Sequence, residues 1–167
     1  MGLKRVSVIG LCLAAVAAVV MLAAVIIRPP KIYISEICPS NSETSKKTAM
    51  QDKNGEPSDW IEIYNPTNKD ISLTGFSLSK NGGGDQPLGG YVIKAHDYII
   101  VYCSSAGFEN ADFPHADFSI GKVSEAEIIL KYDSFQCESI KLPKLNKGVS
   151  YSKNVKGEMY VSEPTPL

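Results

Sequence analysis

The chain has 167 residues and a mass of 18.1 kDa, which leaves room for about one domain. Its 17 basic and 18 acidic residues nearly cancel, so the protein lacks the strong positive field that gathers nucleic acid. Hydrophobic residues make up 44% of the chain, but they crowd toward the N-terminus. Composition therefore excludes a second domain of ordinary size and disfavours a nucleic-acid-binding protein.

The first predicted element is an apolar helix over residues 6–27. This run of 22 residues carries no charge, and a helix of that length reaches about 33 Å, enough to cross a bilayer. A short basic region, residues 1–5, precedes it, and residues 28–31 form a linker whose two prolines stop the helix. We therefore expect a transmembrane signal-anchor with a cytoplasmic N-terminus, which places the domain of residues 32–167 on the extracytoplasmic side of the cell membrane.

A cleaved signal peptide is the alternative, because it shares the basic start. Its apolar region usually has about 7 to 15 residues and ends at a small-x-small site. The apolar run here is longer and has no such site at its end; Ala15-Val16-Ala17 has the form but lies inside the run. A lipid-modified Cys12 is disfavoured because the bulky Leu11 precedes it. We expect an uncleaved anchor in which Cys12 is a small apolar residue.

The segment after the anchor has its own charge balance. Residues 31–167 hold 14 lysines, no arginine and all 18 acidic residues, a net charge of −4. Arginine is the side chain that forks onto phosphate and guanine edges, and lysine alone is weaker at both. No nucleic-acid partner is expected.

Eight short strands are predicted after the linker, because β-branched and aromatic residues alternate with polar ones between turn-forming clusters. Helical periodicity is missing, so the pattern favours an all-β sandwich. We expect a serine-rich surface loop at residues 39–49 and a long loop, functional or mobile, at residues 104–116. The predicted strands span residues 31–38, 60–64, 71–79, 90–94, 98–103, 127–132, 135–142 and 158–161. The expected core comprises Trp60 or its neighbours with Ile61, Ile63, Leu73, Phe76, Leu78, Val92, Ile99, Val101, Phe118, Ile128, Leu130 and Ile140.

Several motifs in a fixed order resemble one family. Residues 59–67, Asp-Trp-Ile-Glu-Ile-Tyr-Asn-Pro-Thr, follow an opening Ile-Ser-Glu-Ile strand at 34–37 and precede Leu-Thr-Gly-Phe-Ser-Leu at 73–78. With residues 93–101, 115–120 and a closing Pro-Thr-Pro, the pattern resembles the lamin-tail domain family, in its exported, membrane-anchored bacterial type. The residues that carry the resemblance are Glu36, Asp59, Trp60, Glu62, Tyr64, Asn65, Pro66, Leu73, Gly75, Phe76, Leu78, Phe118, Pro164, Thr165 and Pro166.

The resemblance implies an immunoglobulin-like β-sandwich over nearly all of residues 31–167. Two departures from the family pattern stand out. His96 occupies a place where glycine is common, and the chain stops where the family usually continues with Gly-x-x-Asn. In bacterial relatives such domains are often joined to something larger, including spore-coat kinase-like domains, nucleases and other hydrolases.

Two side chains and one segment could bind a ligand but have a structural interpretation as well. Trp60 could stack on a carbohydrate or peptide, but we expect it to pack in the core or at its rim. Asn65 stands before a proline and is expected to start a turn. The segment 52–59 places oxygen ligands Asp52, Asn54 and Asp59 around a glycine, as a calcium loop does, but it lacks the other carboxylates, so we expect a polar turn and no metal.

Catalytic and zinc-binding patterns are weak. His96 and His115 are the chain's two histidines, and neither has zinc-ligand spacing, so surface roles are expected. Ser104 does not lie in a Gly-x-Ser-x-Gly elbow, so serine hydrolysis is not supported. We expect no catalytic residue and no cofactor.

The cysteines outside the anchor are Cys38, Cys103 and Cys137, an odd number that allows three pairings. Cys38 and Cys103 each end a predicted strand, so they are the first choice if one disulfide forms. Three unpaired, buried thiols are the equal alternative.

These expectations combine into a non-catalytic module, held on the membrane, that recognises or tethers a protein or a cell-envelope polymer through strand edges and long loops. The alternative is an accessory domain of a larger extracytoplasmic enzyme whose catalytic part is absent from this chain.

Overall fold

The computed structural model describes residues 29–41, 50–51, 55, 57–104, 112–121 and 125–166. The chain divides into two compact units, Met1–Pro30 and Lys31–Leu167, of which the second is described below. Within the described residues, no helix has the length and apolar character needed to cross a membrane. The expected anchor at residues 6–27 lies outside the described part of the chain.

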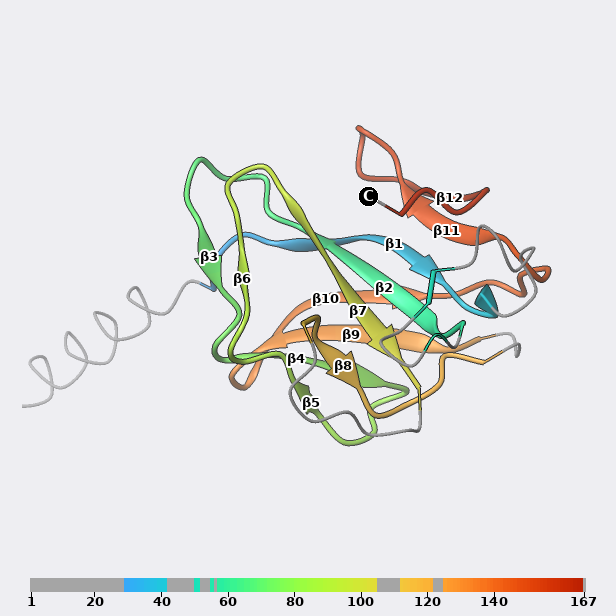
Figure 1. Ribbon diagram of the computed structural model, residues 1–167, viewed down its shortest axis with the longest axis horizontal. Helices are drawn as coiled ribbons and strands as arrows, with labels where there is room; N and C mark the ends of the chain where they lie inside the picture. Colours follow the sequence, from blue (N-terminus) through green and yellow to red (C-terminus); the bar gives the residue numbers. More distant parts are fainter. Residues whose placement is uncertain are drawn as a thin grey trace, which may run out of the picture. The chain divides into compact units, whose positions relative to one another are not determined.

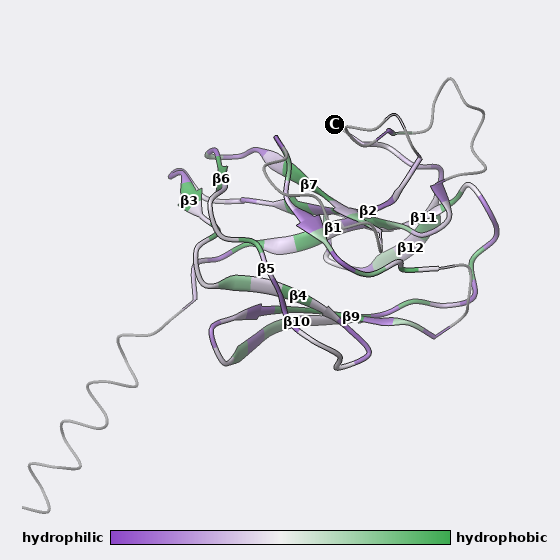
Figure 2. Cartoon of the chain, turned by 60° about the horizontal axis from the view of Figure 1, so that its bottom comes forward, coloured by the Kyte–Doolittle hydropathy of each residue, from purple (hydrophilic) through white to green (hydrophobic). Residues whose placement is uncertain are grey.

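The second unit is a two-layered β-sandwich, as the alternating pattern predicts (Figure 1). One layer is a six-stranded sheet in the order β12-β11-β1-β2-β7-β8, and the other is a four-stranded sheet in the order β10-β9-β4-β5. Figure 2 shows β4, β9 and β10 lying beneath β1, β2, β7 and β11. A two-stranded sheet of β3 and β6 completes the fold. The strands are β1 (Tyr33–Cys38), β2 (Asp59–Tyr64), β3 (Ile71–Ser72), β4 (Phe76–Lys80), β5 (Gln86–Pro87), β6 (Val92–Ile93), β7 (Tyr98–Cys103), β8 (His115–Ala116), β9 (Glu127–Tyr132), β10 (Phe135–Lys141), β11 (Ser150–Lys153) and β12 (Met159–Ser162).

The strand predicted at 71–79 is wrong as a single element. The chain turns after Leu73, because the N–H of Phe76 donates to the carbonyl of Leu73 at 2.9 Å and Gly75 has a φ of +87°. A side chain at Gly75 would lie 3.1 Å from Asp133 and Tyr132, so glycine fits both the conformation and the space. The turn moves the chain from the small sheet of β3 into the four-stranded sheet of β4.

The core lies between the two layers and contains most of the predicted residues. Ile61, Ile63, Leu78 and Leu130 are completely buried there. Val92 is a wrong core prediction, since it is 51% exposed. It pairs with Ser72 while its neighbour Ile93 pairs with Ile71 and is buried, so the alternation of β6 places Val92 outward.

Candidate functional site

The surface of the six-stranded sheet that faces away from the core is here called the outer face. Its position follows from the alternation of β2, whose Ile61 and Ile63 enter the core. Trp60, Glu62 and Tyr64 therefore project from the outer face. Of the seven central motif residues, Asp59 to Asn65, three thus lie on one surface outside the core.

Three tyrosines form a row across this face. Tyr33, Tyr64 and Tyr98 are directly paired on β1, β2 and β7. The rings of Tyr33 and Tyr64 are 5.5 Å apart at 66°, and those of Tyr64 and Tyr98 are 4.4 Å apart at 34°. Partial burial raises the pKa of Tyr33 and of Tyr98, and the nearby Tyr64 hydroxyl raises both further. Both phenols therefore stay neutral at physiological pH. Because the rings are not coplanar, the row does not form a flat platform for stacking a polysaccharide.

A buried acidic pair lies beside the tyrosines. Glu36 on β1 and Glu62 on β2 are paired across the strands, and each is only 3% exposed. Glu62 Oε1 accepts a hydrogen bond from the Ser35 hydroxyl at 2.5 Å. The two oxygens of Glu36 accept from the backbone N–H of Thr165 at 3.0 Å and from its hydroxyl at 2.8 Å. These bonds hold the C-terminal segment, residues 163–166, across the outer face.

The C-terminal segment encloses one side of a cavity of about 410 Å³, here called the tail groove. Trp60 is one of the residues around this cavity. Its side chain is completely buried, as expected for a ring that packs in the core or at its rim. Its Nε1–H has no hydrogen-bond partner among the described residues. A buried donor without an acceptor is costly to stability. The groove is lined by Asn41, Met50, Trp60, Gly148, Val149, Glu163, Pro164 and Pro166.

Asp59 has a structural role rather than an open carboxylate. Its Oδ1 accepts from the N–H of Ser40 at 2.7 Å, and its Oδ2 accepts from the hydroxyl of Ser119 and the N–H of Gly121, both at 2.9 Å. The carboxylate thus joins two loops to the start of β2. Asp52 and Asn54, the other candidate calcium ligands, lie outside the described residues. Within the described part of the chain, no group of three acidic, histidine or cysteine side chains could hold a metal ion.

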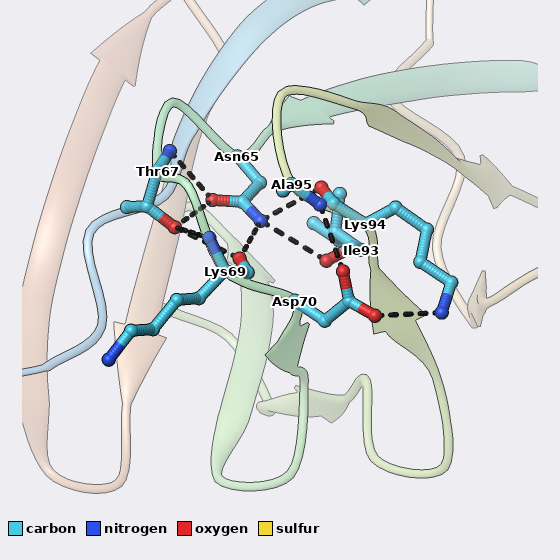
Figure 3. Close-up of polar contacts among 7 residues, drawn as sticks. All are labelled: Asn65, Thr67, Lys69, Asp70, Ile93, Lys94 and Ala95. Carbon is cyan, nitrogen blue, oxygen red and sulfur yellow. Dashed lines mark hydrogen bonds and ion pairs between the residues drawn. The ribbon is translucent and has the colours of Figure 1, made fainter.

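Asn65 organises the corner between β2 and β3, as Figure 3 shows. Its Oδ1 accepts from the N–H of Thr67 at 3.0 Å and from the Thr67 hydroxyl at 2.7 Å, which is the turn geometry predicted for an asparagine before proline. Its Nδ2 lies 2.8 Å from the carbonyl of Lys69, 3.1 Å from that of Ile93 and 2.8 Å from that of Lys94. The fully buried side chain therefore ties two turns together, and ligand binding is not its role.

The same corner places His96 in a backbone conformation that favours glycine. His96 has a φ of +57°, in the left-handed region that L residues rarely adopt. Its Nε2 lies 2.6 Å from the side-chain oxygen of Asn68 at the exposed surface.

We expect His96→Gly to change the free energy of unfolding by less than about 1 kcal/mol, since relief of backbone strain offsets the greater entropy of the unfolded chain. His96→Val should lower that free energy by about 1 to 2 kcal/mol, because a β-branched residue fits the left-handed region poorly. Urea unfolding of both variants measures the difference. A valine variant as stable as the glycine variant would contradict this assignment.

The second histidine contacts Ser104. The Ser104 hydroxyl lies 2.9 Å from Nε2 of His115, so this bond joins the two ends of the loop predicted at 104–116. The parallel pairing of β7 with β8 continues the closure, with Tyr102 opposite His115. Both residues are half-buried, and neither lines the tail groove. The contact is accounted for by loop closure.

Of the two cysteine alternatives, the structure has the unpaired one: Cys38, Cys103 and Cys137 are free thiols, and the Cys38–Cys103 disulfide, the first choice if one bond forms, is absent from it. Cys38 pairs with Trp60 and Cys103 pairs with Asp59, so β2 lies between them. Two strand spacings separate their Cα atoms by about 9.6 Å, beyond the roughly 7 Å that a disulfide spans. The side chains also lie on opposite faces, since Cys38 packs with Trp60 and Cys103 packs in the core.

Native alkylation should therefore modify Cys137 while Cys38 and Cys103 stay protected. Burial raises the pKa of Cys38 to about 12 and that of Cys103 well above its usual value, so neither forms the reactive thiolate near neutral pH. Cys137 is half-buried on β10 and more accessible. After denaturation without reductant, mass spectrometry should find all three modified. Recovery of any of them as a disulfide would contradict the structure.

Two parts of the site escaped prediction from sequence. The tail groove depends on a contact between Glu36 and Thr165, which are 129 positions apart. β11 was missed because its sequence, Ser-Tyr-Ser-Lys, is polar, although its period-2 pattern was present. Its serines are buried: Ser150 and Ser152 both contact the hydroxyl of Ser162, at 3.0 and 2.6 Å. Hydroxyls that satisfy one another permit this burial.

The model of the Lamin Tail Domain family matches residues 28–142, which confirms the resemblance carried by the motifs from Glu36 to Phe118. The match ends before β11, so the closing Pro164-Thr165-Pro166, although bonded to Glu36, lies beyond it. No curated protein matches the chain.

Proposed function

Because the chain belongs to the lamin tail domain family, a family of non-catalytic immunoglobulin-like domains, we propose that it is a binding module rather than an enzyme. The proposal places the module on the extracytoplasmic side of the cell membrane, held by the apolar run at residues 6–27. There it recognises a protein segment or a cell-envelope polymer. The uncharged length of that run supports the membrane anchor.

The tail groove carries this proposal. Its volume of about 410 Å³ falls in the range of roughly 300 to 1,000 Å³ that ligand sites occupy. Met50, Val149 and two prolines supply apolar contact, while Asn41 and Glu163 add polar side chains to the lining. This lining suits an extended polypeptide segment with apolar side chains. The tilted tyrosine rings make a flat polysaccharide a poorer fit.

Photo-crosslinking in the cells that make the protein tests the proposal. A photoreactive amino acid replaces Val149, which lines the groove, and the matched control carries it at Val92, which is exposed on β6 and does not line the groove. We expect Val149 to capture a defined protein or envelope polymer that Val92 does not. Identical products from both positions would contradict the groove as the binding site. Capture of one catalytic polypeptide would support the accessory-domain role instead.

A further inference from the structure

The sheets end in strands that differ in how well they resist pairing with another chain. β3, β5, β6 and β8 have two residues each, and β10 is bulged between Gln136 and Glu138. Shortness, bulges and charges are the usual protection of an edge. β12 has none of these within its own length: it pairs regularly with β11 over four residues, from Met159 to Ser162. It is also the outermost strand of the six-stranded sheet (Figure 1).

The hydrogen-bond register identifies the groups that β12 presents at its open edge. The N–H of Asn154 donates to the carbonyl of Glu158 at 2.9 Å, which makes these two a hydrogen-bonded pair. Because such pairs alternate along an antiparallel ladder, Tyr160 and Ser162 also direct their peptide groups toward β11. Met159 and Val161 therefore direct their N–H and C=O groups away from β11. Among the described residues, no strand lies on that side.

The side chains of this edge are apolar and its ends are acidic. Tyr160 is 48% exposed and Val161 is 54% exposed, and they lie on opposite faces of the strand. An added strand would thus gain apolar contact on both faces. Glu158 and Glu163 flank the strand, and residues 158–163 contain no basic side chain.

We propose that β12 binds an extended segment of another protein that has basic residues at its ends and joins the sheet as an additional strand. Backbone bonds to Met159 and Val161 would hold the segment, and Glu158 and Glu163 would select its charge. A second copy of β12 fits less well, because pairing would bring the acidic ends of both copies together. The family match ends at residue 142, so the site belongs to a segment beyond it. The backbone edge of β12 does not line the tail groove, and Glu163 is the one residue named for both sites, so the strand-edge proposal stands on separate observations from the function proposed above.

Titration of the full chain in a non-ionic detergent tests the proposal. Two synthetic peptides of alternating valine and threonine serve as probes, one with lysine at both ends and one with glutamate. At low ionic strength the lysine peptide should bind at least about tenfold more tightly, and the amide resonances of Met159 and Val161 should shift most. Val161→Pro removes an outward N–H without removing a bond to β11, and it should weaken binding by about tenfold or more. Val161→Ala and the matched edge variant Phe135→Lys, on β10, should keep it.

Charge reversal provides a second test if the proline variant does not fold. The double variant Glu158→Lys, Glu163→Lys should prefer the glutamate peptide. Equal binding of both peptides by the parent chain, or undiminished binding by folded Val161→Pro, would overturn the proposal. A dimer in sedimentation that Val161→Pro abolishes would also overturn it, by showing that the occupant is a second copy. Crosslinking from Val149 in the Val161→Pro chain reports on the groove separately, so failure at one site is distinguishable from failure at the other.

Discussion

Replacing Asn65 with alanine should lower the free energy of unfolding by about 3 kcal/mol. The side chain is fully buried, and its removal leaves carbonyls of Lys69, Ile93 and Lys94 and the N–H of Thr67 without their present partner. Each buried polar group left unpaired costs about 1 to 3 kcal/mol, although water can reach some of them at this corner. Urea unfolding, followed by the fluorescence of Trp60, the chain's one tryptophan, measures the loss.

Asn68 gives a matched control for this change. It lies in the same corner, but it is exposed, and its side-chain oxygen contacts only the exposed His96 ring. Asn68→Ala should change stability by less than about 0.5 kcal/mol. Asn65→Asp should be at least as harmful as Asn65→Ala, because an oxygen would then face three carbonyl oxygens. Equal stability of the Asn65 and Asn68 variants would refute this account of the corner.

Replacing Asp59 with alanine should cost about 3 kcal/mol of stability. Its carboxylate accepts three hydrogen bonds, from Ser40, Ser119 and Gly121, and bonds to a charged acceptor contribute about 1.5 to 3 kcal/mol each, reduced here by partial exposure. Asp59→Asn should fall between the parent and the alanine variant, since the amide keeps one acceptor oxygen. Urea unfolding again provides the measurement.

The control for Asp59 is Asp97→Ala, which removes an exposed carboxylate bonded to the adjacent N–H of Tyr98. This change should cost less than about 1 kcal/mol. Because Asp59 is committed to protein donors, added calcium should leave the unfolding midpoint of the parent chain unchanged. A calcium-dependent rise in the midpoint that Asp59→Ala removes would contradict the structural role.

Local patterns predicted the strands that have a strong apolar alternation. β2, β7 and β9 follow from runs such as Ile-Glu-Ile-Tyr and Tyr-Ile-Ile-Val, because one apolar face must be buried. β5 and β8 have two residues each and contain no pattern long enough to detect. The strand predicted at 71–79 is split by a turn at Gly75. The glycine indicates a turn, but nothing local in the sequence indicates that the chain passes from one sheet to another there.

The candidate site was predictable only where its parts are local. The turn at Asn65 follows from the asparagine and proline that stand together. Alternation places Trp60 opposite Ile61 but does not say that the outer face is covered, since the cover comes from the C-terminal segment. The choice between a Cys38–Cys103 disulfide and unpaired thiols stayed open for the same reason. Cys38 and Cys103 end predicted strands, but the order of β1, β2 and β7 in the sheet decides their separation.

The position of β1 in the sheet also bears on how the protein is made. β1 lies between β2 and β11, and its Glu36 accepts hydrogen bonds from Thr165, so the first strand of the domain depends on residues 129 positions further along the chain. A ribosome supplies those residues after the other strands of the domain, and contacts between distant positions form slowly. Until they arrive, β1 has a partner on one side only, and the Glu36 carboxylate lacks its hydrogen-bond donor Thr165. The domain should therefore complete its folding only after synthesis of this segment.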